Sequence, residues 1–167
     1  MLFRSDYLKP DLQIASYQQL DVGMLQRAGI ELLICDIDNT LAVHDEKLPV
    51  ANVSEFVRKV QAADLKFCLI SNNREERVRQ YGEALGVRAY AFALKPMKHT
   101  YRKILNDFQV DAHQCACLGD QLLTDGLGAK RMKMLMILSQ PLSEKDIIYT
   151  RINRHAERWI LKQFEKR

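Results

Sequence analysis

Short apolar runs bounded by polar loops divide the chain into alternating strands and helices. Continuous runs of this kind are typical of strands buried on both faces of a parallel sheet. The pattern predicts strands over 32–37, 66–70, 87–92, 115–118 and 134–138. Strands that alternate with single helices favour an α/β fold: a doubly wound, Rossmann-like sheet of five parallel strands with helices on both faces.

Apolar residues that recur every three or four positions predict amphipathic helices between these strands. Pro49 is expected in the first turn of one helix, and Gly86 at the end of the next. Asn73, followed three residues later by Glu76, predicts a capping box at the start of that second helix.

A chain of 167 residues is expected to form one domain with a full hydrophobic core. Residues 1–30 form a polar lead-in, 31–140 the core, and 141–167 a C-terminal amphipathic helix. One face of that helix is apolar, and the other is basic, with Arg151, Arg154, Arg158 and Lys162. A basic face suits either an anionic membrane surface or solvent, and both alternatives stay open.

The composition, with 47% hydrophobic and 28% charged residues and a net charge of +4, is that of an ordinary globular protein. No stretch approaches the ~18 apolar residues that span a bilayer, and the N-terminus lacks the apolar core of a signal peptide. We therefore expect a cytoplasmic protein. The four cysteines follow apolar patterning and the four histidines are scattered, so neither set predicts disulfides or a metal site.

The first predicted strand runs directly into two carboxylates, Asp36 and Asp38. Ligands of open α/β sheets bind at the carboxyl ends of the strands. Two buried like charges need a partner, and carboxylate oxygen favours a hard divalent cation. The later strands are followed by further polar side chains: Ser71, Lys95, Asp120 and Asp125. In a parallel sheet all of them gather at one edge.

These residue types suit phosphoryl transfer. One carboxylate can attack phosphorus, and the second can protonate the leaving oxygen and then deprotonate a water molecule. Mg²⁺ held by Asp36 and Asp120 would stabilise the growing negative charge. Ser71 and Lys95 would bind the phosphate oxygens.

The segment Asp36-Ile37-Asp38-Asn39-Thr40 resembles the DxDxT signature of the haloacid dehalogenase-like (HAD) phosphatases. Ser71, Lys95 and the segment from Gly119 to Asp125 match the other three motifs in order, over about residues 30–140. The details of these motifs resemble the YqeG-type subfamily IIIA, which includes phosphatidylglycerophosphate phosphatases.

The resemblance implies a role for each matching residue. Asp36 would be the nucleophile, and Asp38 the general acid and base that also binds Mg²⁺ through its backbone carbonyl. Phosphate would be bound by Ser71, Asn72 and Lys95. Asp120 would complete the metal site, with Asp125 as a further ligand or its support.

Members of this family often carry a cap domain inserted after the first motif or between the second and third. Neither 40–71 nor 71–95 has room for a cap, so we expect an open pocket that admits a bulky phosphorylated substrate. The resemblance favours a lipid headgroup of the phosphatidylglycerophosphate type, with peripheral membrane contact through the C-terminal helix. No nucleic-acid partner is expected.

Two other functions stay open at this point. A small soluble metabolite suits the site if a second subunit covers it. A receiver-like signalling module uses similar residues, but it takes phosphate on its third strand. The third predicted strand, 87–92, carries no carboxylate.

Overall fold

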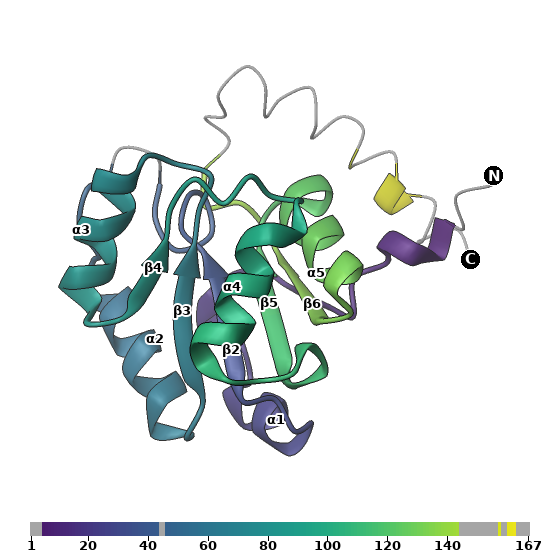
Figure 1. The fold of residues 1–167 in the computed structure, drawn as a ribbon, viewed down its shortest axis with the longest axis horizontal. Coiled ribbons are helices and arrows are strands. Elements are labelled where there is room, and N and C mark those ends of the chain that lie inside the picture. Colours follow the sequence, from purple (N-terminus) through teal and green to yellow (C-terminus); the bar gives the residue numbers. More distant parts are fainter. Residues whose placement is uncertain (1–4, 44–45, 144–156, 158–159, 163–167) are drawn as a thin grey trace.

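The computed structural model describes residues 5–43, 46–143, 157 and 160–162. They form one six-stranded sheet in the order β1-β6-β5-β2-β3-β4 (Figure 1). The strands are β1 (Leu12–Ile14), β2 (Leu32–Asp36), β3 (Lys66–Ile70), β4 (Arg88–Tyr90), β5 (Cys115–Gly119) and β6 (Leu135–Ser139). Every neighbouring pair is parallel. All strands therefore end at the same side of the sheet, which we call the carboxyl edge.

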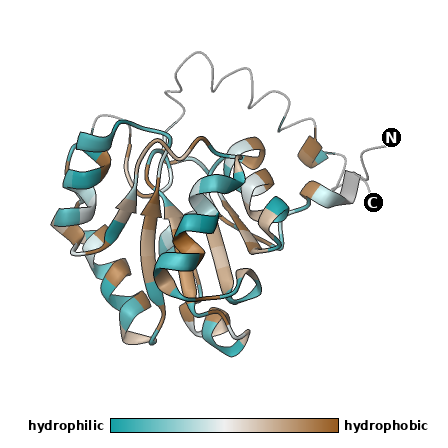
Figure 2. Ribbon diagram, viewed as in Figure 1, coloured by the Kyte–Doolittle hydropathy of each residue, from teal (hydrophilic) through white to brown (hydrophobic). Residues whose placement is uncertain are grey.

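Helices cover both faces of the sheet. The helices α1 (Val22–Arg27), α2 (Ala51–Ala62) and α3 (Glu75–Leu85) pack on one face, and α4 (Lys98–Phe108) and α5 (Leu127–Met132) on the other. Successive residues of β2 point to opposite faces of the sheet. Leu33 packs in the hydrophobic cluster with α1, α2 and α3, and Ile34 packs in the cluster with α4 and α5. Figure 2 shows hydrophobic strands between helices that carry hydrophilic residues outward. The predicted fold class is confirmed.

The sheet has a sixth strand that the sequence pattern did not predict. β1 lies in the stretch 1–30, which was expected to be a polar lead-in, and pairs with β6. With only three residues, it is too short to show a recognisable alternation. Asp11 leads into it: its backbone N donates to Met136 O at 3.0 Å, and its Oδ2 accepts from Met136 N at 2.7 Å.

The described chain between the motifs holds no helix or strand beyond those of the core. Residues 41–43 and 46–70 contain only α2 and β3, and 72–94 contain only α3 and β4. No cap domain is therefore inserted in these described segments. All four cysteines are buried and free of disulfides.

Most of the predicted C-terminal helix, 141–167, lies outside the described residues. Glu157 is buried, and its Oε1 accepts a hydrogen bond from Leu123 N at 2.9 Å. Ile160 and Leu161 pack against the same hydrophobic cluster as α4 and α5. These residues contact the core, and the membrane contact stays a prediction. Across the described chain, none of the helices has the length and apolar character needed to cross a bilayer.

Candidate active site

Asp36 is the last residue of β2, which lies between β5 and β3 in the middle of the sheet. The four residues before it are fully buried, so the strand itself fixes the position of the carboxylate. Its side chain is only 7% exposed. Beyond Asp38 the chain turns at Asn39, which has a left-handed backbone (φ 62°) that Asn tolerates better than most residues.

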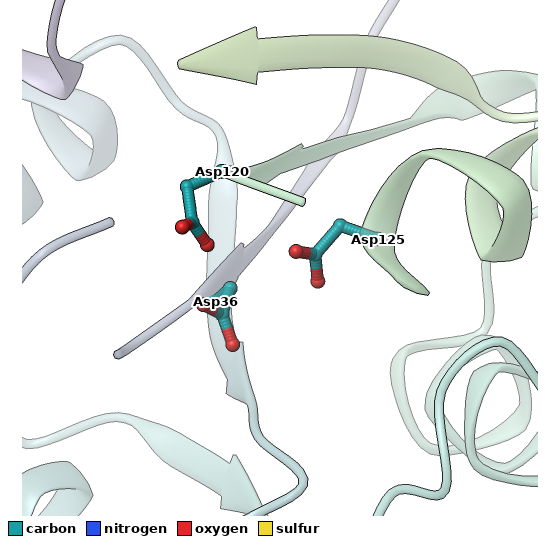
Figure 3. A group of neighbouring side chains, drawn as sticks. All are labelled: Asp36, Asp120 and Asp125. Carbon is teal, nitrogen blue, oxygen red and sulfur yellow. The ribbon is translucent and has the colours of Figure 1, made fainter. Parts of the chain in front are cut away.

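Three buried carboxylates converge at the carboxyl edge (Figure 3). One oxygen from each of Asp36, Asp120 and Asp125 lies within 4.8 Å of the other two. Asp120 follows β5, and Asp125 lies in a π-helical turn, η4 (Leu122–Gly126). Gly119 makes the approach possible, because a Cβ at that position would lie 2.2 Å from Asp125 Cγ. We call these three residues the carboxylate cluster.

Lys95 inserts its ammonium group into this cluster. Its Nζ lies 2.5 Å from Asp36 Oδ1 and 2.6 Å from Asp125 Oδ1. Burial lowers the pKa of Lys95, but Asp125 and Asp36 outweigh this effect and raise the pKa above its usual range. The amine therefore stays charged at neutral pH.

Asn72 holds the backbone of Lys95 from both sides. Its Oδ1 accepts from Lys95 N at 2.7 Å, and its Nδ2 donates to Lys95 O at 3.4 Å. The side chain also borders the pocket. Its predicted contact with phosphate stays a prediction, and the contact that the structure shows is with Lys95.

The carboxylate cluster concentrates negative charge at one buried point. Among the described residues, three buried carboxylates lie beside the buried ammonium group of Lys95. Burial raises the pKa of Asp36 well above its usual range; Lys95 opposes this rise, and Asp125 and Asp120 add to it. A hard divalent cation would offset this repulsion, and a set of carboxylate oxygens is the donor set that such a cation prefers. The residues present therefore fit a divalent metal.

Asp38 lies outside this cluster and has different partners. Its Oδ2 accepts from Ser71 Oγ at 3.1 Å and from Asn73 Nδ2 at 3.4 Å. The predicted capping box of Asn73 and Glu76 is therefore wrong. The Asn73 side chain is directed to Asp38, and α3 begins at Glu75 with Arg74 as its N-cap.

Arg77 is a site residue that the sequence reasoning missed. Its Nη2 and Nε donate to Asp38 Oδ1 at 2.9 and 3.3 Å. An arginine in the first turn of a helix is ordinarily a solvated side chain, so its residue type alone carries no signal. Its position in the first turn of α3, six residues after Ser71 and at the carboxyl edge, was the available clue.

The pocket at this edge has a volume of about 310 Å³ and is lined by polar or charged residues: Asp36, Asp38, Ser71, Asn72, Asn73, Lys95, Gln121 and Thr124. The structure thus brings five of the predicted residues to the pocket wall, with Asp120 and Asp125 beside them in the carboxylate cluster. Gln121 and Thr124 were not predicted.

Thr40 links two members of the carboxylate cluster, since its Oγ1 donates to Asp36 Oδ2 at 3.3 Å and to Asp120 Oδ1 at 3.5 Å.

A wound parallel sheet with an acidic pocket at its carboxyl edge is typical of α/β enzymes whose active sites are built from carboxylates. The sequence matches the haloacid dehalogenase-like hydrolases over residues 6–133, and the chain belongs to this family. The resemblance seen in the four motifs is confirmed.

A curated relative extends the comparison to nearly the whole chain. The sequence is 30% identical over 161 residues to "Probable phosphatase YqeG" of Bacillus subtilis (strain 168), covering 96% of this chain and 94% of that protein. Together with the family match, this confirms the predicted enzyme class, a HAD-type phosphatase. The receiver-like alternative gains no support.

Solved structures share the fold at low sequence identity. An uncharacterized protein from Listeria monocytogenes serotype 4b has a TM-score of 0.55 and 18% identity, covering 71% of this chain and 86% of that chain. The cobalt-bound deoxy-D-mannose-octulosonate 8-phosphate phosphatase of Haemophilus influenzae has a TM-score of 0.52 and 16% identity, covering 68% and 80% respectively. At these sequence identities, the similarity to the two solved structures shows a shared fold.

Proposed function

We propose that this protein is a Mg²⁺-dependent phosphomonoester hydrolase that acts through an aspartyl-phosphate formed on Asp36. The observation that carries the proposal is the contact of Asp36 with Lys95, at the end of the central strand and beside a polar pocket. A carboxylate oxygen of Asp36 would attack phosphorus, and the bond from phosphorus to the alcohol oxygen would break. The phosphoryl group would thus move to Asp36.

Asp38 is the proposed general acid and base. It would donate a proton to the leaving alcohol oxygen, and then accept a proton from the water that attacks the aspartyl-phosphate. That second attack breaks the bond between phosphorus and Asp36 and releases phosphate. The Ser71 hydroxyl and the Lys95 ammonium would bind phosphate oxygens in both steps, with Asn72 supporting Lys95 and bordering the same oxygens.

The carboxylates of Asp36, Asp120 and Asp125 and the backbone carbonyl of Asp38 would hold the metal. When bound, Mg²⁺ supplies charge neutralisation between the anionic nucleophile and the anionic phosphate. The support for this assignment is the convergence of one oxygen from each of the three buried carboxylates within 4.8 Å, since carboxylate oxygens are the ligands that a hard divalent cation prefers.

Mg²⁺ binding is expected to stabilise the fold independently of turnover. At a concentration about 100-fold above Kd, binding adds about 2.7 kcal/mol, and so raises Tm by roughly 5–10 °C. Asp120→Asn should lose most of this shift and most of the hydrolysis of 4-nitrophenyl phosphate. Asp64→Asn is the control, because Asp64 is exposed between α2 and β3, away from the carboxyl edge. Differential scanning fluorimetry gives Tm, and an unchanged turnover rate in EDTA would exclude the metal.

For the substrate, we propose a phosphomonoester carried by an amphiphile, of the phosphatidylglycerophosphate type. Seven large apolar side chains are exposed among the described residues, and six lie in loops at the carboxyl edge: Leu48, Val50, Phe92, Leu94, Met97 and Leu142. We call these six the apolar rim. The described loops at the opposite edge carry none of the seven. A polar pocket within an apolar rim complements a phosphorylated headgroup attached to apolar chains. A small soluble metabolite would leave the rim in water.

Polar substitutions in the apolar rim are expected to act only on lipid substrates. Phe92 and Leu94 both have left-handed backbones (φ 46° and 51°), which Asn tolerates, so Phe92→Asn/Leu94→Asn is the suitable variant. The two side chains each contribute roughly 1.5 kcal/mol or more on burial. We therefore expect kcat/KM for phosphatidylglycerophosphate in mixed micelles to fall by at least about tenfold. Hydrolysis of soluble 4-nitrophenyl phosphate should stay within about twofold.

The matched control is Tyr7→Asn, which removes the exposed large apolar side chain that, among the described residues, lies outside the apolar rim. It should change neither activity. Equal losses on the micellar and the soluble substrate, or no loss on either, would favour the small soluble metabolite.

A further inference from the structure

Arg77 joins separate parts of the carboxyl edge through one guanidinium group. Its side chain is 18% exposed, and it reaches from α3 to Asp38 Oδ1 with Nη2 at 2.9 Å and Nε at 3.3 Å. Its Nη1 donates to the backbone carbonyl of Glu46, in the loop between β2 and α2. A planar guanidinium with three N–H groups engaged fixes both the distance and the direction of its partners.

The two oxygens of Asp38 therefore have different surroundings. Oδ1 faces Arg77, whereas Oδ2 faces Ser71 and Asn73, both of which line the pocket. Asp38 itself lies beyond the end of β2, where the sheet no longer fixes the chain. Its side-chain direction thus depends on the groups that bind it.

We propose that Arg77 is a positioning residue for the proton transfers of Asp38. The inference rests on the proposed function and adds a residue to it. By occupying Oδ1, Arg77 leaves Oδ2 toward the pocket as the oxygen that exchanges the proton. As the bond from phosphorus to the alcohol breaks, its electron pair goes to the alcohol oxygen, which takes the proton from Oδ2. In the second step Oδ2 takes a proton from the attacking water. Arg77 gains and loses no proton.

The geometry predicts that removing the Arg77 guanidinium lowers kcat/KM by an amount that depends on the leaving group. An alkyl phosphate needs a proton on its leaving oxygen, whereas 4-nitrophenolate leaves readily without one. Misplacing a reacting group by about 1 Å costs roughly 100-fold in rate. In Arg77→Met, kcat/KM for an alkyl phosphate such as glycerol 3-phosphate should fall by about 100-fold. For 4-nitrophenyl phosphate it should fall by less than about fivefold.

Three further variants make the test specific. Arg79→Met is the matched control, since Arg79 lies two residues further along α3, is exposed and pairs with Glu83 at 2.6 Å. It should leave both substrates unaffected. Arg77→Lys keeps the charge without the fork of donors, and should recover part of the alkyl phosphate activity. Adding Arg77→Met to Asp38→Asn should cause no further loss of kcat/KM for the alkyl phosphate, because both residues act on the same proton transfer.

Two outcomes overturn the inference. One is an equal loss on both substrates, which assigns Arg77 to binding or folding. The other is a double variant whose losses multiply, which separates Arg77 from Asp38. The proposed function is tested apart from these outcomes, because it fails if Asp36→Asn still hydrolyses either substrate or if turnover of the wild type is unchanged in EDTA.

Discussion

Asp36→Asn is expected to abolish hydrolysis of an aryl phosphate, with kcat reduced by at least about four orders of magnitude, as for other covalent nucleophiles. An amide of nearly the same shape has no anionic oxygen with which to attack phosphorus. Because Lys95 keeps its contact with Asp125, the variant should remain folded. Initial rates with 4-nitrophenyl phosphate, together with circular dichroism of the variant, check this expectation.

The aspartyl-phosphate can also be sought directly. Acid quenching of the wild-type enzyme during turnover, followed by mass spectrometry, should find the phosphoryl group on the peptide that contains Asp36. Asp107→Asn serves as the control, since Asp107 lies near the C-terminal end of α4 and accepts a hydrogen bond from Tyr90 Oη at 2.8 Å, and it does not line the pocket. Substantial residual activity in Asp36→Asn would exclude Asp36 as the nucleophile, and with it the proposed mechanism.

Lys95→Met should produce the largest loss of stability among single substitutions at the site. The ammonium group contacts two carboxylates, and the side chains of all three residues are at least 93% buried. Removing one partner of a buried ion pair leaves uncompensated charge and costs about 3–5 kcal/mol. Urea unfolding of the wild type and the variant gives the difference in the free energy of unfolding, and Mg²⁺ should restore part of it by pairing with the carboxylates that Lys95 no longer contacts.

Lys66→Met is the matched control for this experiment. Lys66 pairs with Glu31 at 3.7 Å, and both side chains are more than 40% exposed. Surface pairs of this kind contribute about 0–1 kcal/mol. If Lys95→Met lost no more stability than Lys66→Met, the buried contacts with Asp36 and Asp125 would contribute little to the free energy of unfolding.

The elements with long apolar runs could be read from the sequence almost residue by residue. β3 has the predicted bounds, and β2 ends one residue early, at the nucleophile candidate. Such strands are buried on both faces, so their hydrophobicity is a local signal. β1 escaped prediction because three residues carry no such signal, and its place depends on the pairing of Asp11 with Met136.

The location of the candidate site was predictable from the sequence, but the contacts within it were not. Strand order along the chain placed the acids, the hydroxyl and the amine at one edge, because parallel strands all end there. What each side chain contacts at that edge was not predictable. Asn73 illustrates this, because its local pattern indicated a helix cap, and Asp38, 35 residues away in sequence, took its side chain instead.

By itself, then, the sequence determined the strands β2 to β6, the helices between them and the side of the sheet at which the chemistry is proposed to lie, because burial and periodicity act over a few neighbouring residues. Only the tertiary structure decided that Lys95 lies between Asp36 and Asp125, that Arg77 holds Asp38, and that the six side chains of the apolar rim remain exposed at the carboxyl edge. Those facts depend on distances between residues far apart in the chain, which are set when the helices and loops pack around the sheet.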